Sequence, residues 1–217
     1  MSRRTPRSRS SGPSDVFLNI PYDRRFGRLY IAFIAGLASF GLKPRATLEI
    51  PGGERRLDRI VDLIRACSYS LHDLSRVQLD RRPPSTPRFN MPFELGLAVA
   101  WAKVGKRSAT WFVFESMSRR LQKSLSDLDG TDVYVHDGSV DGVFRELSNA
   151  FVRSDRQPTI QEMRAVYADL KRASRRIRRQ AGAKTIFEAR VFKNLVYLAG
   201  KLADAAQAYR EPARARL

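Results

Sequence analysis

The residue that the sequence places best for chemistry is Glu94, in the stretch Arg-Phe-Asn-Met-Pro-Phe-Glu-Leu-Gly at residues 88–96. Pro92 suits the first position of a helix, where its missing N–H would have no partner. Glu94 would then lie in the first turn, where the helix dipole favours an ionised carboxylate. Gly96, one turn in, would let another backbone or a ligand come close.

A structural role for Glu94 is the competing interpretation, because acidic residues are common in first turns for dipole reasons alone. The two-way cap called a capping box needs Ser or Thr at the N-cap, and this stretch has Met91 there. The sequence therefore leaves open whether Glu94 supports its helix or presents a reactive carboxylate.

Polar side chains follow two of the expected strands. Ligands of open parallel sheets bind beyond the carboxyl ends of the strands, near the point where the strand order reverses. The candidates at this edge are Asn19, Tyr22 and Asp23 after the first strand, and His72, Asp73 and Ser75 at the end of the third.

Each candidate also has a purely structural interpretation. Asp73 would equally form a local turn with the residues that follow it, His72 would be a core or strand-end residue, and Tyr22 would cover the edge of the core. The Pro-Gly-Gly stretch at residues 51–53 precedes a helix and is consistent with a phosphate cradle, but a plain turn explains it as well.

Strands alternating with helices predict how these residues are positioned. We expect strands at residues 16–20, 43–50, 69–74, 109–114 and 132–135, and helices at residues 23–41, 54–66, from Pro92 onward, and 140–152. This alternation predicts an α/β, flavodoxin-like three-layer domain with a parallel sheet in the order 2-1-3-4-5.

Two further helices are expected at the C-terminus. Residues 159–162 and 185–188 both match the capping-box pattern, and each precedes an apolar stripe at helical spacing. The short connection at residues 180–184 predicts an antiparallel hairpin, whose wide stripe would contact the core domain or a second subunit. We therefore expect a basic disordered tail (1–14), an α/β domain (15–153) and a basic helical hairpin (154–217), with residues 158–209 as the candidate surface for a homo-oligomer.

The net charge of +18 lies mainly outside the expected α/β domain. Residues 1–14 carry four Arg and no acid, and residues 151–217 carry 16 basic and 6 acidic residues. Arg172, Arg175, Arg176, Arg178 and Arg179 form a run in the first C-terminal helix. Weak polyanion binding is the natural role of such a run, although a solvated face explains it as well, and no sequence-reading motif accompanies it.

The remaining composition indicates a globular protein of a reducing compartment, which we expect to be cytoplasmic. The single Cys67 cannot form an internal disulfide. One Cys and two distant His give no metal site, and we expect no cofactor. The apolar run at residues 29–42 is too short to span a bilayer and predicts a buried helix, so no membrane partner is expected.

Three phrases taken together resemble a known superfamily: VFLNIPYD (16–23), HDLS (72–75) and FNMPFELGLA (89–98). It joins TIR-like domains and nucleoside 2-deoxyribosyltransferase-like proteins, which are flavodoxin-like in fold. The Glu-Leu-Gly element is similar to the one that carries the catalytic glutamate of the deoxyribosyltransferases, and the strand before Tyr22-Asp23 is similar to the start of a TIR-like domain. The resemblance covers about residues 15–150.

This resemblance implies cleavage or transfer at the N-glycosidic bond of a nucleoside, nucleotide or NAD. Glu94 would stabilise or capture the oxocarbenium-like sugar. Asp73 would hold sugar hydroxyls or orient the base, Ser75 and Asn90 would add hydrogen bonds, and Arg76 and Arg88 would favour a substrate that bears phosphate. Asn19, Tyr22, Asp23 and His72 complete the expected substrate-binding set.

The chain also departs from the deoxyribosyltransferases. They generally carry further acidic residues before the glutamate, where this sequence has Asp80 in a basic loop, and only Asp127 and Asp129 are available near the last strand. Three functions remain open: an N-glycosidase of NAD or a related nucleotide, as in immune or stress effectors; a non-enzymatic nucleotide-binding signalling module; and a nucleic-acid-associated protein.

Overall fold

The fold is described from a computed structural model of the chain, for residues 15–49, 55–77, 83, 86–105, 109–152 and 156–214, with side chains to residue 209. The N-terminal segment 1–14, the Pro-Gly-Gly stretch at 51–53 and Asp80 lie outside the described residues. In the described part of the chain, no helix is long and apolar enough to cross a membrane.

Five parallel strands form one sheet in the order β2-β1-β3-β4-β5, which confirms the expected flavodoxin-like order. The strands are β1 (Asp15–Asn19), β2 (Lys43–Arg45), β3 (Tyr69–Asp73), β4 (Thr110–Glu115) and β5 (Val133–Val135). The connections reverse direction between β1 and β3, so these two neighbouring strands mark the switch point of the sheet.

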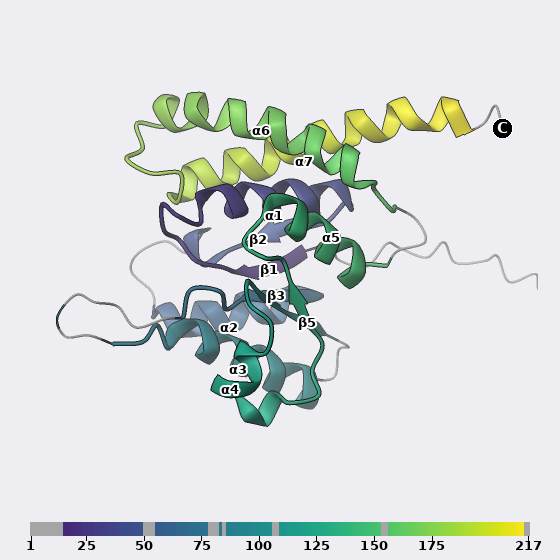
Figure 1. Cartoon of the computed structure of the whole chain (residues 1–217). Coiled ribbons are helices and arrows are strands. Elements are labelled where there is room, and N and C mark those ends of the chain that lie inside the picture. Colours follow the sequence, from purple (N-terminus) through teal and green to yellow (C-terminus); the bar gives the residue numbers. More distant parts are fainter. Residues whose placement is uncertain are drawn as a thin grey trace, which may run out of the picture.

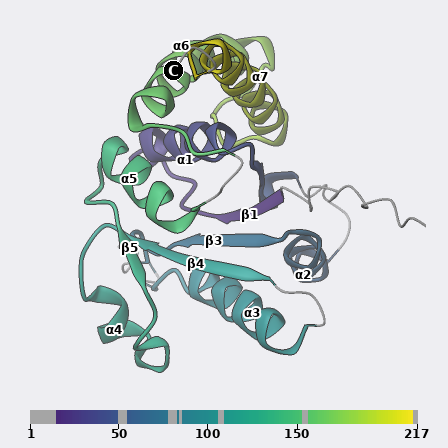
Figure 2. The ribbon, with the colours of Figure 1, turned by 90° about the vertical axis from the view of Figure 1, so that its right-hand side faces the viewer.

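Helices cover both faces of the sheet. They are α1 (Gly27–Ser39), α2 (Arg56–Ala66), α3 (Asn90–Val104), α4 (Arg120–Ser124), α5 (Val140–Ala150), α6 (Ile160–Gln180) and α7 (Ala189–Arg214). Viewed along the sheet, α1 and α5 lie on one face and α2 and α3 on the other, while α6 and α7 form a further layer outside α1 (Figure 2).

Beyond its first two residues, the helix α1 is enclosed on all sides. Every residue from Leu29 to Ser39 is buried, because the sheet and α5 cover one part of its surface and the C-terminal hairpin covers the rest. Gly36 makes this packing possible, since a Cβ there would collide with the side chain of Leu147 on α5. The nearly all-apolar sequence of α1 is explained by this enclosure.

The hairpin of α6 and α7 packs on α1, as Figure 1 shows, so its apolar stripe is covered within this chain. Its buried residues include Met163, Val166, Leu170, Val191, Phe192 and Leu195. The capping box at Thr159 and Glu162 is formed. The second one is not: Thr185 and Glu188 bond within the turn, and α7 begins only at Ala189.

Some element boundaries differ from the expected ones. Asp23 closes a turn before α1, so that helix begins at Gly27. The expected strand 43–50 pairs with β1 only over Lys43–Arg45, and a 3-10 helix follows at Thr47–Glu49. The connection between β4 and β5 contains α4 and a 3-10 helix at Ser126–Leu128.

Candidate functional site

A row of enclosed polar side chains lies at the carboxyl edge of the sheet. Each is at most 5% exposed. The row consists of Asn19 at the end of β1, His72 and Asp73 at the end of β3, Glu115 at the end of β4, and His136 directly after β5. Because parallel strands end on the same side, these residues meet even though the chain separates them widely.

The Asn19 amide joins β1 to β3 and to the start of α3. Its Nδ2 donates to Nδ1 of His72 at 3.1 Å and to the carbonyl oxygen of Met91 at 3.0 Å. Since Nδ1 of His72 accepts, the ring proton lies on Nε2, which has no hydrogen-bond partner among the described residues. Burial lowers the pKa of His72 to about 3, so the ring is uncharged at neutral pH.

Both oxygens of the Asp73 carboxylate are used inside the protein. Oδ1 accepts hydrogen bonds from the backbone N–H of Ser75 at 2.9 Å and from the Ser75 hydroxyl, which forms the turn that the sequence allowed. Oδ2 lies 2.9 Å from Nε2 of His136, which donates because Nδ1 of that ring accepts from the N–H of Gly138. Direct contact of Asp73 or Ser75 with a sugar does not fit this geometry.

The helix that carries Glu94 begins earlier than expected. Phe89 already has helical backbone angles and accepts a bond from the N–H of Phe93 at 3.0 Å, so α3 begins at Asn90. Pro92 is the third helical residue. An N–H at this position has no intrahelical acceptor, so proline costs the helix no hydrogen bond there. Glu94 is therefore the fifth residue, and the expected stabilisation of its ionised form in the first turn is wrong.

Glu94 is instead largely buried. The residue is 4% exposed, and its carboxylate forms no hydrogen bond with another described residue. Burial raises its pKa from 4.5 to about 7, against the opposing effect of the Arg56 guanidinium. Glu94 therefore changes its charge near neutral pH. Gly96 lies on the exposed side of α3 with open space around it, so the expected close approach of another backbone does not occur.

Three of the predicted binding residues meet in one ion cluster. Oδ2 of Asp23 accepts from Nε of Arg76 at 3.2 Å and from Nη1 of Arg88 at 3.4 Å. Its other oxygen accepts from the backbone N–H groups of Arg25 and Phe26 at the start of α1. The cluster keeps one net positive charge, and among the described residues each guanidinium uses only one of its five N–H groups, which leaves others for an anion.

Among the described residues, neither Tyr22 nor Asn90 forms a hydrogen bond with this cluster. The Tyr22 hydroxyl donates to the carbonyl of Leu18 at 3.4 Å, and its ring lies 6.1 Å from that of Phe187. Burial raises the pKa of Tyr22, and the charge of Glu94 adds to this effect, so the two residues are electrostatic neighbours. Asn90 is an exposed residue at the start of α3.

Sequence reasoning missed three of the residues that build this edge. The sequence holds a signal for His136, because this residue directly follows the Val-Tyr-Val strand, just as Asp73 ends the third strand. Glu115 ends β4 and pairs with Arg120 of α4. The acids considered near the last strand, Asp127 and Asp129, are both exposed.

Within the described residues, no group of three or more His, Cys, Asp or Glu is placed to hold a metal ion. The arrangement can bind an anion at Arg76 and Arg88, and it holds a carboxyl group of raised pKa nearby. Comparison with known proteins adds no identity: no protein-family model matches the chain, and no curated protein sequence matches it.

Proposed function

We propose that the carboxyl edge near β1 and β3 binds a nucleotide and that Glu94 acts at its base–sugar bond. The protein would then be an N-glycosidase of NAD or a related nucleotide, in the manner of prokaryotic immune or stress effectors. The observation that carries this proposal is the largely buried Glu94 side chain, whose carboxylate has no hydrogen bond to another described residue.

The contrast with Asp73 supports a functional role for Glu94. Buried carboxylates that serve the fold are hydrogen-bonded, as Asp73 is to Ser75 and His136. A carboxyl group kept in a low-dielectric place without such bonds costs stability. Groups with strongly raised pKa values at the ligand-binding edge of a fold are candidates for catalysis.

The proposed chemistry uses Glu94 in its ionised form. As the base departs with the bonding electron pair, positive charge develops on the sugar, and a nearby carboxylate stabilises that charge strongly where water is excluded. Water then adds to the sugar carbon and gives up a proton, which Glu94 accepts. A cationic base such as the nicotinamide of NAD would itself favour the ionised carboxylate before it leaves as a neutral molecule.

The cluster of Asp23, Arg76 and Arg88 would hold the phosphates of the substrate. Arginine binds phosphate with two parallel N–H bonds, and Asp23 fixes both side chains by their contacts with Oδ2. Tyr22 would form a wall between this cluster and Glu94.

A test compares wild-type protein with Glu94→Gln after incubation with NAD and a panel of nucleotides. We expect chromatography to detect free base with wild-type protein and none with Glu94→Gln. Glu146→Gln on α5, an equivalent substitution outside the carboxyl edge, should retain the activity. No release by wild-type protein at any concentration would contradict the glycosidase proposal.

One observation favours a non-enzymatic nucleotide-binding module as the second candidate. Most glycosidases use a pair of carboxylates, and the bonds of Asp73 leave it unavailable as the partner of Glu94. A thermal-shift screen with the same nucleotides separates the two functions. Stabilisation by a ligand that is never cleaved, and that Glu94→Gln alters only in affinity, would favour the binding module.

A further inference from the structure

A cavity of about 860 Å³ lies between the start of α1 and the turn that joins α6 to α7. Figure 1 shows why it forms there: α6 ends, α7 begins and α1 begins on the same side of the molecule. We call this space the basic cavity, after the five cations that line it: Arg24, Arg175, Arg178, Arg179 and Lys184.

The positive charge of the basic cavity is not neutralised by the protein. Among the described residues, none of its five cations forms an ion pair, and the acid in its lining, Asp23, is held by Arg76 and Arg88. Nη1 of Arg178 donates to the carbonyl oxygen of Lys184 at 3.2 Å, which ties the end of α6 to the turn. Like charges gathered this closely favour the binding of an anion.

The apolar part of the lining contains two aromatic rings. Tyr22 and Phe187 lie 6.1 Å apart, and Phe187 is only partly buried. The ring of Tyr30 packs edge-on against Phe187 at 5.0 Å, and its enclosed hydroxyl has no partner among the described residues. Partly exposed aromatic rings beside cations suit a planar ring joined to a negatively charged group.

We propose that the basic cavity binds a nucleotide that carries two or three phosphates. This site adjoins the one proposed for Glu94, because Tyr22 and Asp23 border both, but its own cations come from Arg24 and from the hairpin. Arg175, Arg179 and Lys184 would contact the phosphates, and the base would lie against Phe187. The volume is typical of sites for small ligands. This assignment does not depend on whether Glu94 cleaves a substrate.

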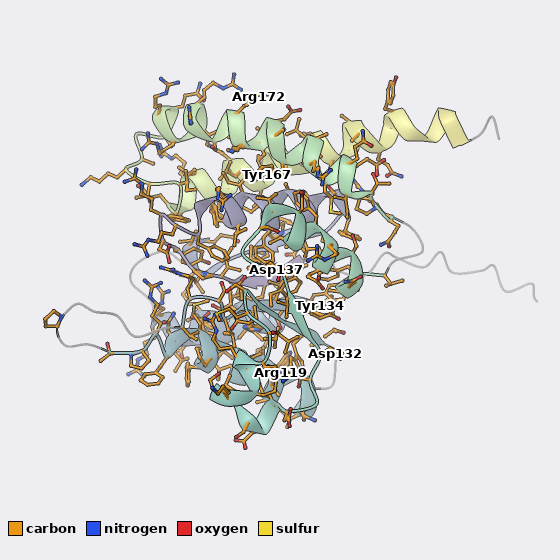
Figure 3. The ribbon with its side chains drawn as sticks, in the orientation of Figure 1. Arg119, Asp132, Tyr134, Asp137, Tyr167 and Arg172 are labelled. Carbon is orange, nitrogen blue, oxygen red and sulfur yellow. The ribbon has the colours of Figure 1, made fainter. Side chains whose placement is uncertain are left out.

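The shape of the lining favours a small ligand over a nucleic acid. Three separate segments surround the basic cavity, whereas a nucleic acid would be expected to use the open arginine surface of α6 as well. Arg172 is 78% exposed and lies on the outer side of α6, whereas Tyr167 faces α5 (Figure 3). Arg172 and Arg176 do not line the basic cavity.

These two outer arginines provide a matched control. Arg175→Gln/Arg179→Gln and Arg172→Gln/Arg176→Gln remove the same charge from the same helix at the same spacing. Calorimetric titration of the full chain with ATP should give an affinity at least about tenfold weaker for the first double variant. The second should remain within about twofold of wild type, since a distant exposed charge contributes little in 0.15 M salt.

Two further measurements identify the parts of the ligand. Phe187→Leu should weaken the binding of ATP severalfold and leave the binding of inorganic triphosphate unchanged, because only ATP has a base that can stack on the Phe187 ring. Glu94→Gln should bind ATP as wild type does, so that failure of the proposed catalysis and failure of this site give different results.

Three outcomes would overturn the assignment. Wild-type protein that binds no ATP at millimolar concentration has no such site. Equal losses in the two double arginine variants, together with stronger binding of a single-stranded oligonucleotide, would mean general polyanion binding by α6. Loss of ATP binding in Glu94→Gln but not in Arg175→Gln/Arg179→Gln would move the ligand to the carboxyl edge of the sheet.

Discussion

Asp73 and His136 are 63 residues apart in the sequence, yet Nε2 of His136 lies 2.9 Å from Oδ2 of Asp73. Both side chains are fully buried. Since β4 lies between β3 and β5, this bond joins the ends of two strands that do not pair with each other. It therefore ties β3 to β5 at the carboxyl edge of the sheet, whereas the Asn19 amide ties β1 to β3.

Asp73→Asn should destabilise the fold. The Asp73 carboxylate accepts from the hydroxyl and N–H of Ser75 and from the His136 ring, whereas an amide offers one oxygen and turns an NH₂ group toward one of these donors. We expect the free energy of unfolding to fall by about 2–3 kcal/mol, because a buried polar group loses its partner. Urea denaturation measures this change.

Asp137→Asn is the matched control for that experiment. Asp137 lies beside His136 after β5, but its side chain is exposed and pairs with Arg145 (Figure 3). Asn also tolerates the left-handed backbone of this residue, whose φ is 54°. We expect a change within about 0.5 kcal/mol; equal losses in the two variants would refute a special role for the Asp73–His136 bond.

The raised pKa of Glu94 predicts a stability that depends on pH. An unfolded Glu titrates near 4.5 and the folded one near 7, so the folded state binds more protons between these values. The free energy of unfolding therefore falls as pH rises from 4.5 to 7, by about 3 kcal/mol over this whole range.

Glu94→Gln removes this titration. Relative to wild type, the variant should gain stability as pH rises from 5 to 8, and the two proteins should be most alike near pH 5. Urea denaturation at four pH values measures the difference. Parallel pH profiles for wild type and Glu94→Gln would contradict the enclosed position of Glu94.

Asn19→Ala should also destabilise the protein, by about 2–4 kcal/mol. The substitution leaves the buried Nδ1 of His72 without a donor, and it removes a second bond from the carbonyl oxygen of Met91, which also accepts within α3. Nitrogen chemical shifts of the His72 ring would report the lost bond directly. Asn149→Ala on the exposed side of α5 should change the stability by no more than about 0.5 kcal/mol.

The packing of the hairpin on α1 predicts that the hairpin and the sheet domain unfold in one cooperative transition. Leu195→Ala removes a fully buried side chain of α7 and should lower the free energy of unfolding by about 2–5 kcal/mol. The chain has two tryptophans, Trp101 on α3 and Trp111 on β4, so fluorescence reports on the sheet domain alone.

The fluorescence transition of Leu195→Ala should shift together with the helical circular dichroism signal. A hairpin that unfolds by itself would leave the tryptophan transition unchanged, which would contradict shared packing. Tyr197→Ala, two residues away and 69% exposed, tests that the effect comes from burial.

The fold was predictable because its signals are local. The all-apolar stretch of α1 predicts a helix covered on every side, and strand–helix alternation predicts the order β2-β1-β3-β4-β5. Boundaries depend on contacts that periodicity does not contain. In α2, for example, Leu57 lies exposed in the first turn, whereas Ile60, Leu63 and Ile64 are buried.

The candidate site was predictable in position more than in detail. The carboxyl ends of β1 and β3 carry Asn19, His72 and Asp73 as expected, but their partners come from distant segments. The bond from His136 to Asp73 depends on the strand order, and the enclosure of Glu94 depends on where α3 begins. A sequence pattern that takes Pro92 as the first helical residue cannot reveal that Phe89 already starts the turn.

The enclosure of α1 limits how this protein can be divided or rebuilt. Since every residue of α1 from Leu29 to Ser39 is buried, a substitution there must fit against the hairpin, α5 or the sheet, and Gly36 shows how little space remains. A hairpin transplanted from another protein would need a matching α1. The smallest exchangeable unit therefore includes α1, α6 and α7 together, although α1 and the hairpin are separated by more than a hundred residues of sequence.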